Sequence, residues 1–105
     1  PYYSYGRIDR AISQLSKGLN QKFNIDAFIA VGGWAQFDPI AYKKRLKPFE
    51  DRIKRKEVLI IVADTAPQQL QLLKDNLSHV NIGQNPYVMG VESINKLYQI
   101  ARNKP

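Results

Sequence analysis

The chain has 105 residues, no cysteine, and 16 Lys and Arg against 9 Asp and Glu, which gives a net charge of +7. This length allows one domain with a modest core, and the lack of cysteine excludes disulfides and thiolate chemistry. No apolar run approaches the roughly 20 residues that span a bilayer. The chain starts with Pro, almost directly on a helical pattern, and we therefore expect a soluble piece of a longer polypeptide.

The first predicted element is a helix over residues 8–19. Its apolar residues recur at helical spacing and are Ile8, Ala11, Ile12, Leu15 and Leu19. A polar break follows at 24–26. The uncharged run 27–31 then predicts a parallel strand that is covered on both faces.

A second helix is expected to begin at Asp38 and Pro39, because Asp caps exposed amides and Pro suits the first helical position. Its predicted inner face consists of Tyr42, Leu46, Phe49 and Ile53. Pro48 lies inside this stretch, so we expect the helix to break near Lys47.

The run 58–62 is β-branched and uncharged, and it predicts the central strand of the sheet. Pro67 opens a shorter helix that places Leu70, Leu73 and Leu77 on one side. The segment 79–82 alternates in polarity, which predicts a strand near a sheet edge.

The last predicted helix runs from about residue 87 to residue 102. Its apolar stripe, expected to face inward, consists of Val91, Ile94, Leu97, Tyr98 and Ala101. Helices and strands thus alternate along the chain, and right-handed crossovers make such a sheet parallel with helices on both faces. The predicted fold class is α/β, a three-layer α/β/α arrangement around a parallel sheet.

Polar or aromatic residues follow each predicted strand, and open parallel sheets bind ligands at that rim. Gly33 and Trp34 follow the first strand, Asp64 follows the second and Gln84 follows the third. The Asp64 carboxylate can accept hydrogen bonds from the vicinal hydroxyls of a sugar, or it can cap the next helix together with Thr65. The position of Asp64 at the strand end favours the ligand-binding role over the cap.

The other rim residues also have two interpretations. Gln84 carries a donor and an acceptor for a hydroxyl, or it is a turn residue before Pro86. Trp34 offers a flat face for a sugar ring, or it is a core or lid aromatic. Gly33 lets the backbone approach a ligand closely. Each signal is unspecific when taken singly.

Signals for catalysis and nucleic-acid binding are weak. The chain has no phosphate loop, no dinucleotide-binding glycine pattern and no nucleophile elbow, so we expect no enzyme activity, no cofactor and no metal site. His79 stands alone, and we expect a hydrogen-bonded structural role for it. Basic residues are concentrated in 43–56, which is typical of a solvated helix face. Binding of nucleic acid by this run is the less favoured alternative, because no stacking motif or recognition helix accompanies it.

Three segments carry a family resemblance when they are taken together. The first is 24–30, the second is Val62-Ala63-Asp64, and the third is 83–90, which follows the pattern Gln-x-Pro-x-x-Met-Gly. They resemble the type I periplasmic sugar-binding proteins of ABC transporters, which share their fold with the effector domains of LacI-type repressors. In that family the first segment leads to a ligand loop, and the second carries a sugar-binding Asp. The third crosses between lobes and its Gln bonds the sugar.

The resemblance implies a sugar receptor of an ABC transport system in the periplasm or another extracytoplasmic compartment, with the transporter permease as partner of the whole protein. Asp64 and Gln84 then bind the sugar. Gly33 and Trp34 stand where many members have Asn-Asp, so stacking by Trp34 is an extrapolation. The alternatives are the effector domain of a LacI-type regulator and a periplasmic sensor module.

The resemblance also implies how the chain is divided. Residues 1–86 form part of the C-terminal α/β lobe, and residues 87–105 form a hinge-crossing helix that packs on a second lobe in the full receptor. We expect this chain by itself to bind sugar weakly or not at all, because the other wall of the cleft is absent. The last helix is then partly exposed or repacked, and it favours self-association.

Overall fold

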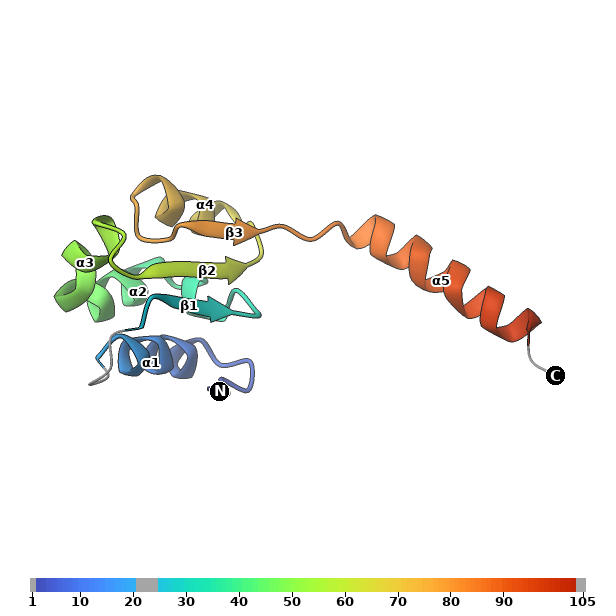
Figure 1. The fold of residues 1–105 in the computed structure, drawn as a ribbon, viewed down its shortest axis with the longest axis horizontal. Helices are drawn as coiled ribbons and strands as arrows, with labels where there is room; N and C mark the ends of the chain where they lie inside the picture. The colour runs from blue at the N-terminus through green and yellow to red at the C-terminus, as the bar shows by residue number, and fades with distance from the viewer. Residues whose placement is uncertain (1, 21–24, 104–105) are drawn as a thin grey trace.

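A computed structural model describes residues 2–20 and 25–103 (Figure 1). The helices are α1 (Ile8–Leu19), α2 (Pro39–Leu46), α3 (Glu50–Lys54), α4 (Pro67–Lys74) and α5 (Pro86–Arg102). The strands are β1 (Ala27–Ala30), β2 (Leu59–Ala63) and β3 (Val80–Ile82), and short 3-10 helices are η1 (Trp34–Gln36) and η2 (Lys47–Phe49). Every predicted element is present, and most begin and end within one or two residues of the expected bounds; α4 ends at Lys74, earlier than the expected end around residues 76–78. Asn24, the first residue of the family-like segment 24–30, lies outside the described residues.

Two predicted helix boundaries are confirmed. Asp38 is the N-cap of α2, and its Oδ1 accepts a hydrogen bond of 3.0 Å from the amide of Ala41. The predicted break near Lys47 is η2, which contains Pro48 and separates α2 from α3. Local chemistry thus decides both positions, because a cap satisfies free amides and Pro removes a helical hydrogen bond.

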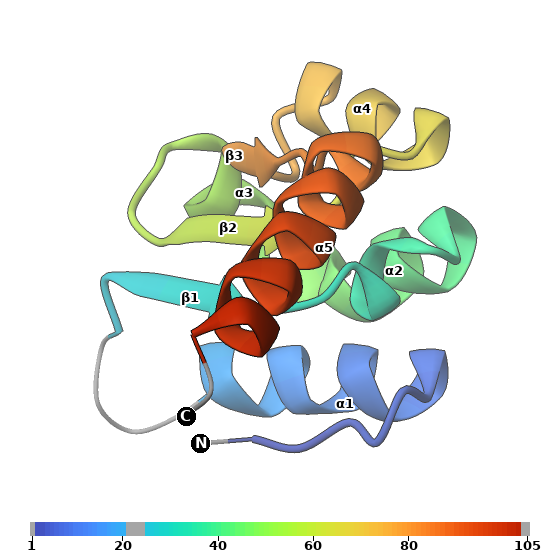
Figure 2. The same cartoon turned by 90° about the vertical axis from the view of Figure 1, so that its right-hand side faces the viewer.

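The three strands form a parallel sheet in the order β1-β2-β3 (Figure 2). Ala27 pairs with Leu59 in β1 and β2, and Ile61 pairs with Val80 in β2 and β3. The prediction of 58–62 as the central strand is confirmed, and β3 is an edge strand. The carboxyl ends of all three strands therefore meet at one rim, on the side from which α5 leaves (Figure 1).

The core lies between one face of the sheet and the helices of the body, α1 to α4. Its fully buried members include Leu15, Tyr42, Leu46, Ile53, Ile60, Val62 and Leu72. The predicted inner face of α2 and α3 is confirmed, with Phe49 packed at the margin of the core. The Tyr42 hydroxyl donates a hydrogen bond of 2.6 Å to the carbonyl of Leu77, and burial raises the pKa of this phenol.

The predicted helical layer on the second face of the sheet is absent from the described residues. Side chains on that face are exposed, with Ile29 at 68% and Ile82 at 56%. The strand order explains this. Both crossovers, β1 to β2 and β2 to β3, move in the same direction across the sheet. Two right-handed crossovers in the same direction put their helices on the same face. The α/β class with a parallel sheet is thus confirmed, and the described part of the chain has two layers instead of three.

Helix α4 buries a different side from the one its leucines indicated. Leu72 is fully buried and so is Gln69, one turn earlier, whereas Leu70 is exposed and Leu73 is half-buried. Leu77 is buried beyond the end of the helix. The buried stripe therefore includes a polar residue that a count of apolar residues passes over.

Helix α5 projects away from the body and buries none of its residues. The radius of gyration is 17.2 Å, against about 13 Å for a compact domain of this length. The prediction that Val91, Ile94, Leu97, Tyr98 and Ala101 face inward is wrong. Their stripe faces solvent, because helical periodicity marks an apolar face and does not supply a surface to cover it. No helix in 2–20 or 25–103 combines the length and the apolar character of a membrane span.

Candidate functional site

Three of the four predicted site residues meet at the rim of the sheet. Asp64 directly follows β2, Gln84 lies in the short link between β3 and α5, and Gly33 precedes η1. The Asp64 carboxylate joins them. Its Oδ2 accepts a hydrogen bond of 3.1 Å from the amide of Gly33, and its Oδ1 accepts one of 2.5 Å from Nε2 of Gln84.

The backbone of Asp64 turns sharply where the chain leaves the sheet. Its φ is +75°, in the left-handed region, which Asp and Asn tolerate better than most residues. Its amide still donates a hydrogen bond of 2.8 Å to the carbonyl of Ile82 and so extends the ladder to β3. The turn places the carboxylate at the rim with its side chain half-buried.

The alternative role of Asp64 as a helix cap is excluded by the geometry. Helix α4 has Ala66 as its N-cap residue, with no side-chain cap from Asp64 or Thr65. The amide of Ala66 instead donates a hydrogen bond of 2.9 Å to Oε1 of Gln69. The Asp64 carboxylate therefore does not cap α4, and its hydrogen bonds among the described residues are to Gly33 and Gln84.

Close packing favours glycine at position 33, because a larger residue would displace the side chains of Phe37 and Asp64. An added Cβ would lie 2.9 Å from Oδ2 of Asp64 and 2.7 Å from Cε1 of Phe37. Gly33 is buried, and its φ of −76° is ordinary for any residue. The absent side chain is therefore what lets its amide reach the carboxylate.

A buried network of amide side chains supports this turn, and it includes no side chain of a predicted site residue. Nδ2 of Asn81 donates to Oε1 of Gln36 at 2.9 Å and to the carbonyl of Asp64 at 3.1 Å. Nε2 of Gln69 donates to Oε1 of Gln36 at 3.2 Å and to the carbonyl of Ala63 at 3.0 Å. These bonds fix the backbone on which the Asp64 carboxylate depends.

The network contains one unsatisfied atom. Nε2 of Gln36 is buried without a hydrogen bond of normal geometry, which is found at no other side-chain nitrogen or oxygen in the described residues, although the Gln36 side chain also interacts with the Tyr42 phenol and lowers its pKa against the larger effect of burial. Sequence offers a partial signal for Gln69 alone, because Gln three residues after an N-cap commonly returns to the N-cap amide. Nothing in the sequence indicates that Gln36 is buried.

Trp34 lies apart from the Asp64 and Gln84 pair. Its ring folds over Gly32, where an added Cβ would come within 1.9 Å of Cζ3. The side chain is 40% exposed and lines a groove beside β1 whose described lining includes neither Asp64 nor Gln84. Stacking of Trp34 on a ligand held by Asp64 stays a prediction.

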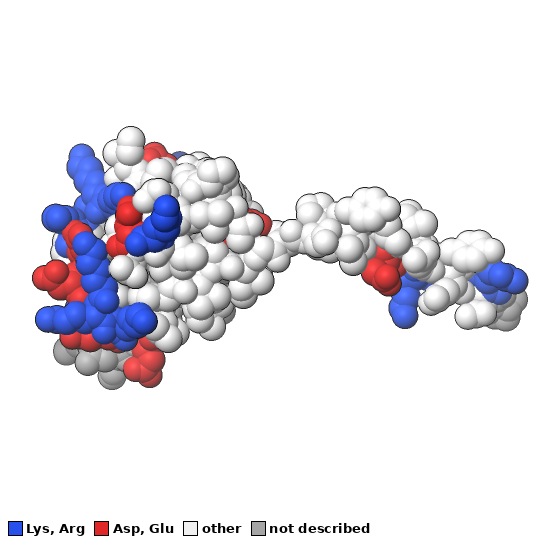
Figure 3. Space-filling model, turned by 90° about the horizontal axis from the view of Figure 1, so that it is seen from above, with Lys and Arg blue, Asp and Glu red and all other residues white. Residues whose placement is uncertain are grey.

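The basic run lies at the opposite end of the body from the rim (Figure 3). Many of its charges have internal partners: Lys43 pairs with Asp75, Arg55 pairs with Glu57, and Arg52 donates to the carbonyl of Leu19. Hydrogen bonds from Lys54 and Lys47 lower the pKa of Glu50 to about 2. This pairing fits the solvated-face interpretation.

His79 has the structural role expected of it. Its Nδ1 accepts a hydrogen bond of 2.8 Å from the amide of Ile60, so the other nitrogen carries the proton and donates to the carbonyl of Ile53 at 2.9 Å. Among the described residues no group of three or more His, Cys, Asp and Glu side chains is placed to hold a metal ion.

The rim thus offers a carboxylate with a carboxamide and a backbone amide each within hydrogen-bond distance of it. This set can bind a ligand that both donates and accepts hydrogen bonds, and it includes no nucleophile with an activating base. No family model matches the chain, and neither a curated protein nor a solved structure shows significant similarity to it.

Proposed function

We propose that the chain supplies one wall of a sugar-binding cleft, with Asp64 and Gln84 as its hydrogen-bonding centre. The single observation that carries this proposal is the contact between the Asp64 carboxylate and the Gln84 amide, at the ends of two neighbouring parallel strands. Ligands of open parallel sheets bind outside the carboxyl ends of the strands.

The chemistry of this pair suits vicinal hydroxyl groups. A carboxylate accepts two hydrogen bonds in fixed geometry, and a carboxamide both donates to and accepts from a hydroxyl. Gln84 is exposed and Asp64 is half-buried, so a ligand can reach both groups. A sugar replaces the contact between the two side chains with hydrogen bonds to its own hydroxyls.

The resemblance of segments 62–64 and 83–90 to type I periplasmic receptors supports a role in sugar uptake through an ABC transporter. In this proposal, residues 1–86 belong to one lobe and α5 crosses to the other, and the permease is the partner of the complete receptor. The same resemblance supports a location outside the cytoplasm. The exposed face of α5 supports the view that a second body is needed to close the cleft.

Titration of the isotopically labelled chain with a panel of pentoses and hexoses tests this proposal. Because one wall leaves much of the sugar in water, we expect millimolar binding with shifts of the Gln84 side-chain amide and the Gly33 amide. Asp64→Asn keeps the shape and the left-handed turn but loses the charge, so it removes these shifts.

Cyclohexanol, with one hydroxyl, serves as the matched control ligand and is expected to leave both amides in place. The same sugar-induced shifts in Asp64→Asn would contradict the site. Calorimetry that finds tight binding of a monosaccharide by this chain would contradict the proposal that it forms only one wall.

A further inference from the structure

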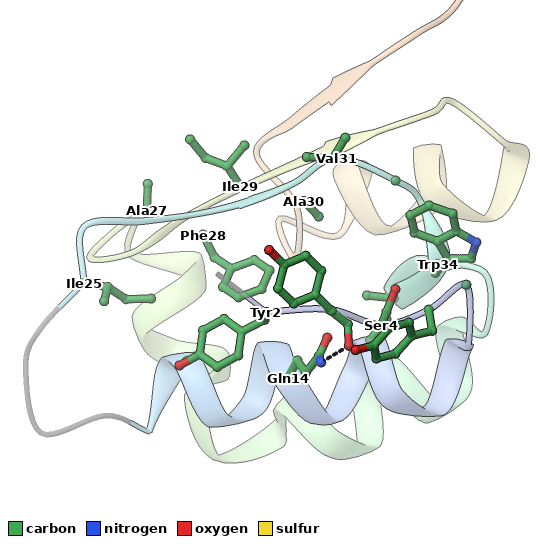
Figure 4. A pocket seen from close by; sticks show the side chains of 17 residues that line it. Tyr2, Ser4, Gln14, Ile25, Ala27, Phe28, Ile29, Ala30, Val31 and Trp34 are labelled. Carbon is green, nitrogen blue, oxygen red and sulfur yellow. Dashed lines mark hydrogen bonds between the residues drawn. The ribbon is translucent and has the colours of Figure 1, made fainter.

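A buried glutamine joins three elements behind the rim of the sheet. Trp34 begins η1 and lines the groove beside β1 (Figure 4), whereas Gln36, two residues later, is fully buried. Its Oε1 accepts hydrogen bonds from Nδ2 of Asn81 in β3 and from Nε2 of Gln69 in α4. One oxygen atom of Gln36 therefore links η1, α4 and β3.

Backbone groups determine which way each amide in this network faces. The carbonyl of Asp64 can only accept, so the atom of Asn81 that lies 3.1 Å from it is Nδ2. The carbonyl of Ala63 determines the position of Nε2 of Gln69 in the same way, at 3.0 Å. Both side chains therefore present NH₂ groups to Gln36, which can face them only with its oxygen. The nitrogen end of Gln36 is left without a hydrogen bond of normal geometry.

The two carbonyls held by this network belong to the peptide groups on either side of the Asp64 Cα. The carbonyl of Ala63 precedes this atom and the carbonyl of Asp64 follows it, so the network bonds to both peptide groups whose relative rotation defines φ and ψ. The φ of Asp64 is +75°, which is unfavourable for a residue with a Cβ and persists where the surroundings hold it. Gln69 and Asn81 therefore hold this turn from both sides.

We propose that Gln36 is a positioning residue of the ligand site, which directs the Asp64 carboxylate without touching the ligand. While the φ of Asp64 is held, Oδ2 lies 3.1 Å from the amide of Gly33 and Oδ1 accepts from Gln84. A turn that relaxed to negative φ would point the Cβ in another direction, and both contacts would be lost. The effect on ligand binding rests on the proposed function, whereas the effect on the carboxylate does not.

Burial alone does not explain a glutamine at position 36. An apolar side chain of the same length, such as Met, would fill the space, but it would leave two buried NH₂ groups one acceptor short. A Glu side chain has the shape of Gln and keeps an oxygen for both donors. Gln36→Met and Gln36→Glu therefore separate the volume of the side chain from its hydrogen bonds.

NMR spectroscopy of the 105-residue chain tests the proposal with these two variants and a control. The control is Ile53→Val, which shortens a fully buried side chain in α3, at the far end of the body from the rim (Figure 1). Two readouts follow the carboxylate without a ligand. One is hydrogen exchange of the Gly33 amide, and the other is the NOE between the amide and α protons of Asp64, which is strong at positive φ because the two protons then lie close together.

We expect Gln36→Met to speed exchange of the Gly33 amide about tenfold more than exchange of the β2 amides, and to remove the strong NOE at Asp64. Gln36→Glu should restore both readouts. Ile53→Val should speed exchange at Gly33 and in β2 alike and keep the NOE. In a titration with pentoses and hexoses, the shift of the Gln84 side-chain amide should disappear in Gln36→Met and persist in Ile53→Val.

Asn81→Leu provides the same comparison if Gln36→Met does not fold. Asn81 is half-buried, and Leu keeps its size but removes the hydrogen bond to the Asp64 carbonyl. We expect this variant to lose the NOE at Asp64 and the protection of the Gly33 amide, as Gln36→Met does.

Three results would overturn the proposal. The first is exchange at Gly33 that rises only in step with the β2 amides in both Gln36→Met and Asn81→Leu, and the second is a strong Asp64 NOE in both. The third is the same loss in folded Gln36→Glu as in Gln36→Met. Failure of the proposed function is a separate outcome, because no sugar would then shift the amides of the unchanged chain, while the two readouts without ligand would still report on Gln36.

Discussion

Helices α1 and α5 both have apolar residues at helical spacing, more sharply gathered on one side in α1, yet one is part of a core and the other is not. Helix α1 has 12 residues and buries Ile12 and Leu15, whereas α5 has 17 residues and buries none. Isolated helices of this length are marginal in water, and most helical stability in proteins comes from packing of an apolar face. The comparison shows that apolar residues at helical spacing become part of a core only where a facing surface exists.

The sharpest way to test this difference is the same substitution in both regions. Leu15→Ala in α1 deletes a fully buried side chain, and we expect it to lower the free energy of unfolding by about 2–5 kcal/mol. Leu97→Ala in α5 deletes a side chain that is 62% exposed, and we expect a change within about 0.5 kcal/mol. Denaturant melts followed by circular dichroism measure both. Similar losses for the two variants would show that α5 is packed in solution.

A smaller effect is expected from paired polar substitutions. His79→Ala leaves the Ile60 amide without a partner inside the body, which should cost about 1–3 kcal/mol, whereas the Ile53 carbonyl keeps its hydrogen bond from the amide of Lys56. Ser93→Ala in α5 removes a hydrogen bond of 2.7 Å to the carbonyl of Met89 at an exposed site, and little change is expected. Thermal denaturation compares the two variants. Equal shifts of Tm would contradict the view that the body is packed and α5 is not.

The smallest effect is expected from removing α5 altogether. A chain that ends at Asn85 keeps every core residue, so its Tm should stay within a few degrees of that of the full chain. In the full chain, the amides of α5 should exchange far faster than those of β2. A large loss of Tm on truncation would mean that α5 folds back onto the exposed face of the sheet.

Local signals account for most of what the sequence predicts correctly. Asp38 and Pro48 act on their own neighbours, so a cap and a helix break could be placed without knowing the fold. The run 58–62 could be predicted as the central strand because its residues are uncharged and mostly β-branched, as in a buried strand. Asp64 and Gln84 could be singled out because each lies within two residues of a strand end, and parallel strands end at a common rim.

Other features depend on residues far apart in the chain and could not be predicted from neighbouring residues. Gln36 and Gln69 are polar residues of usually exposed types, and they are buried because each finds partners more than 30 positions away in the other. In the described residues, the second face of the sheet has no helical layer because of the strand order. The spacing of apolar residues along the chain does not predict strand order. Whether the stripe of α5 is covered depends on a surface that lies outside its own sequence.

The short link that carries Gln84 also determines where α5 points. At 1.5 Å per residue, the 17 residues of α5 form a rod of about 25 Å that is joined to the body through Gly83, Gln84 and Asn85. A rotation of about 10° at this joint displaces the far tip by about 4 Å, by simple leverage over that length. Gln84 lies in this joint and donates a hydrogen bond to the Asp64 carboxylate. A ligand that replaced this bond would therefore act directly at the joint that sets the direction of α5.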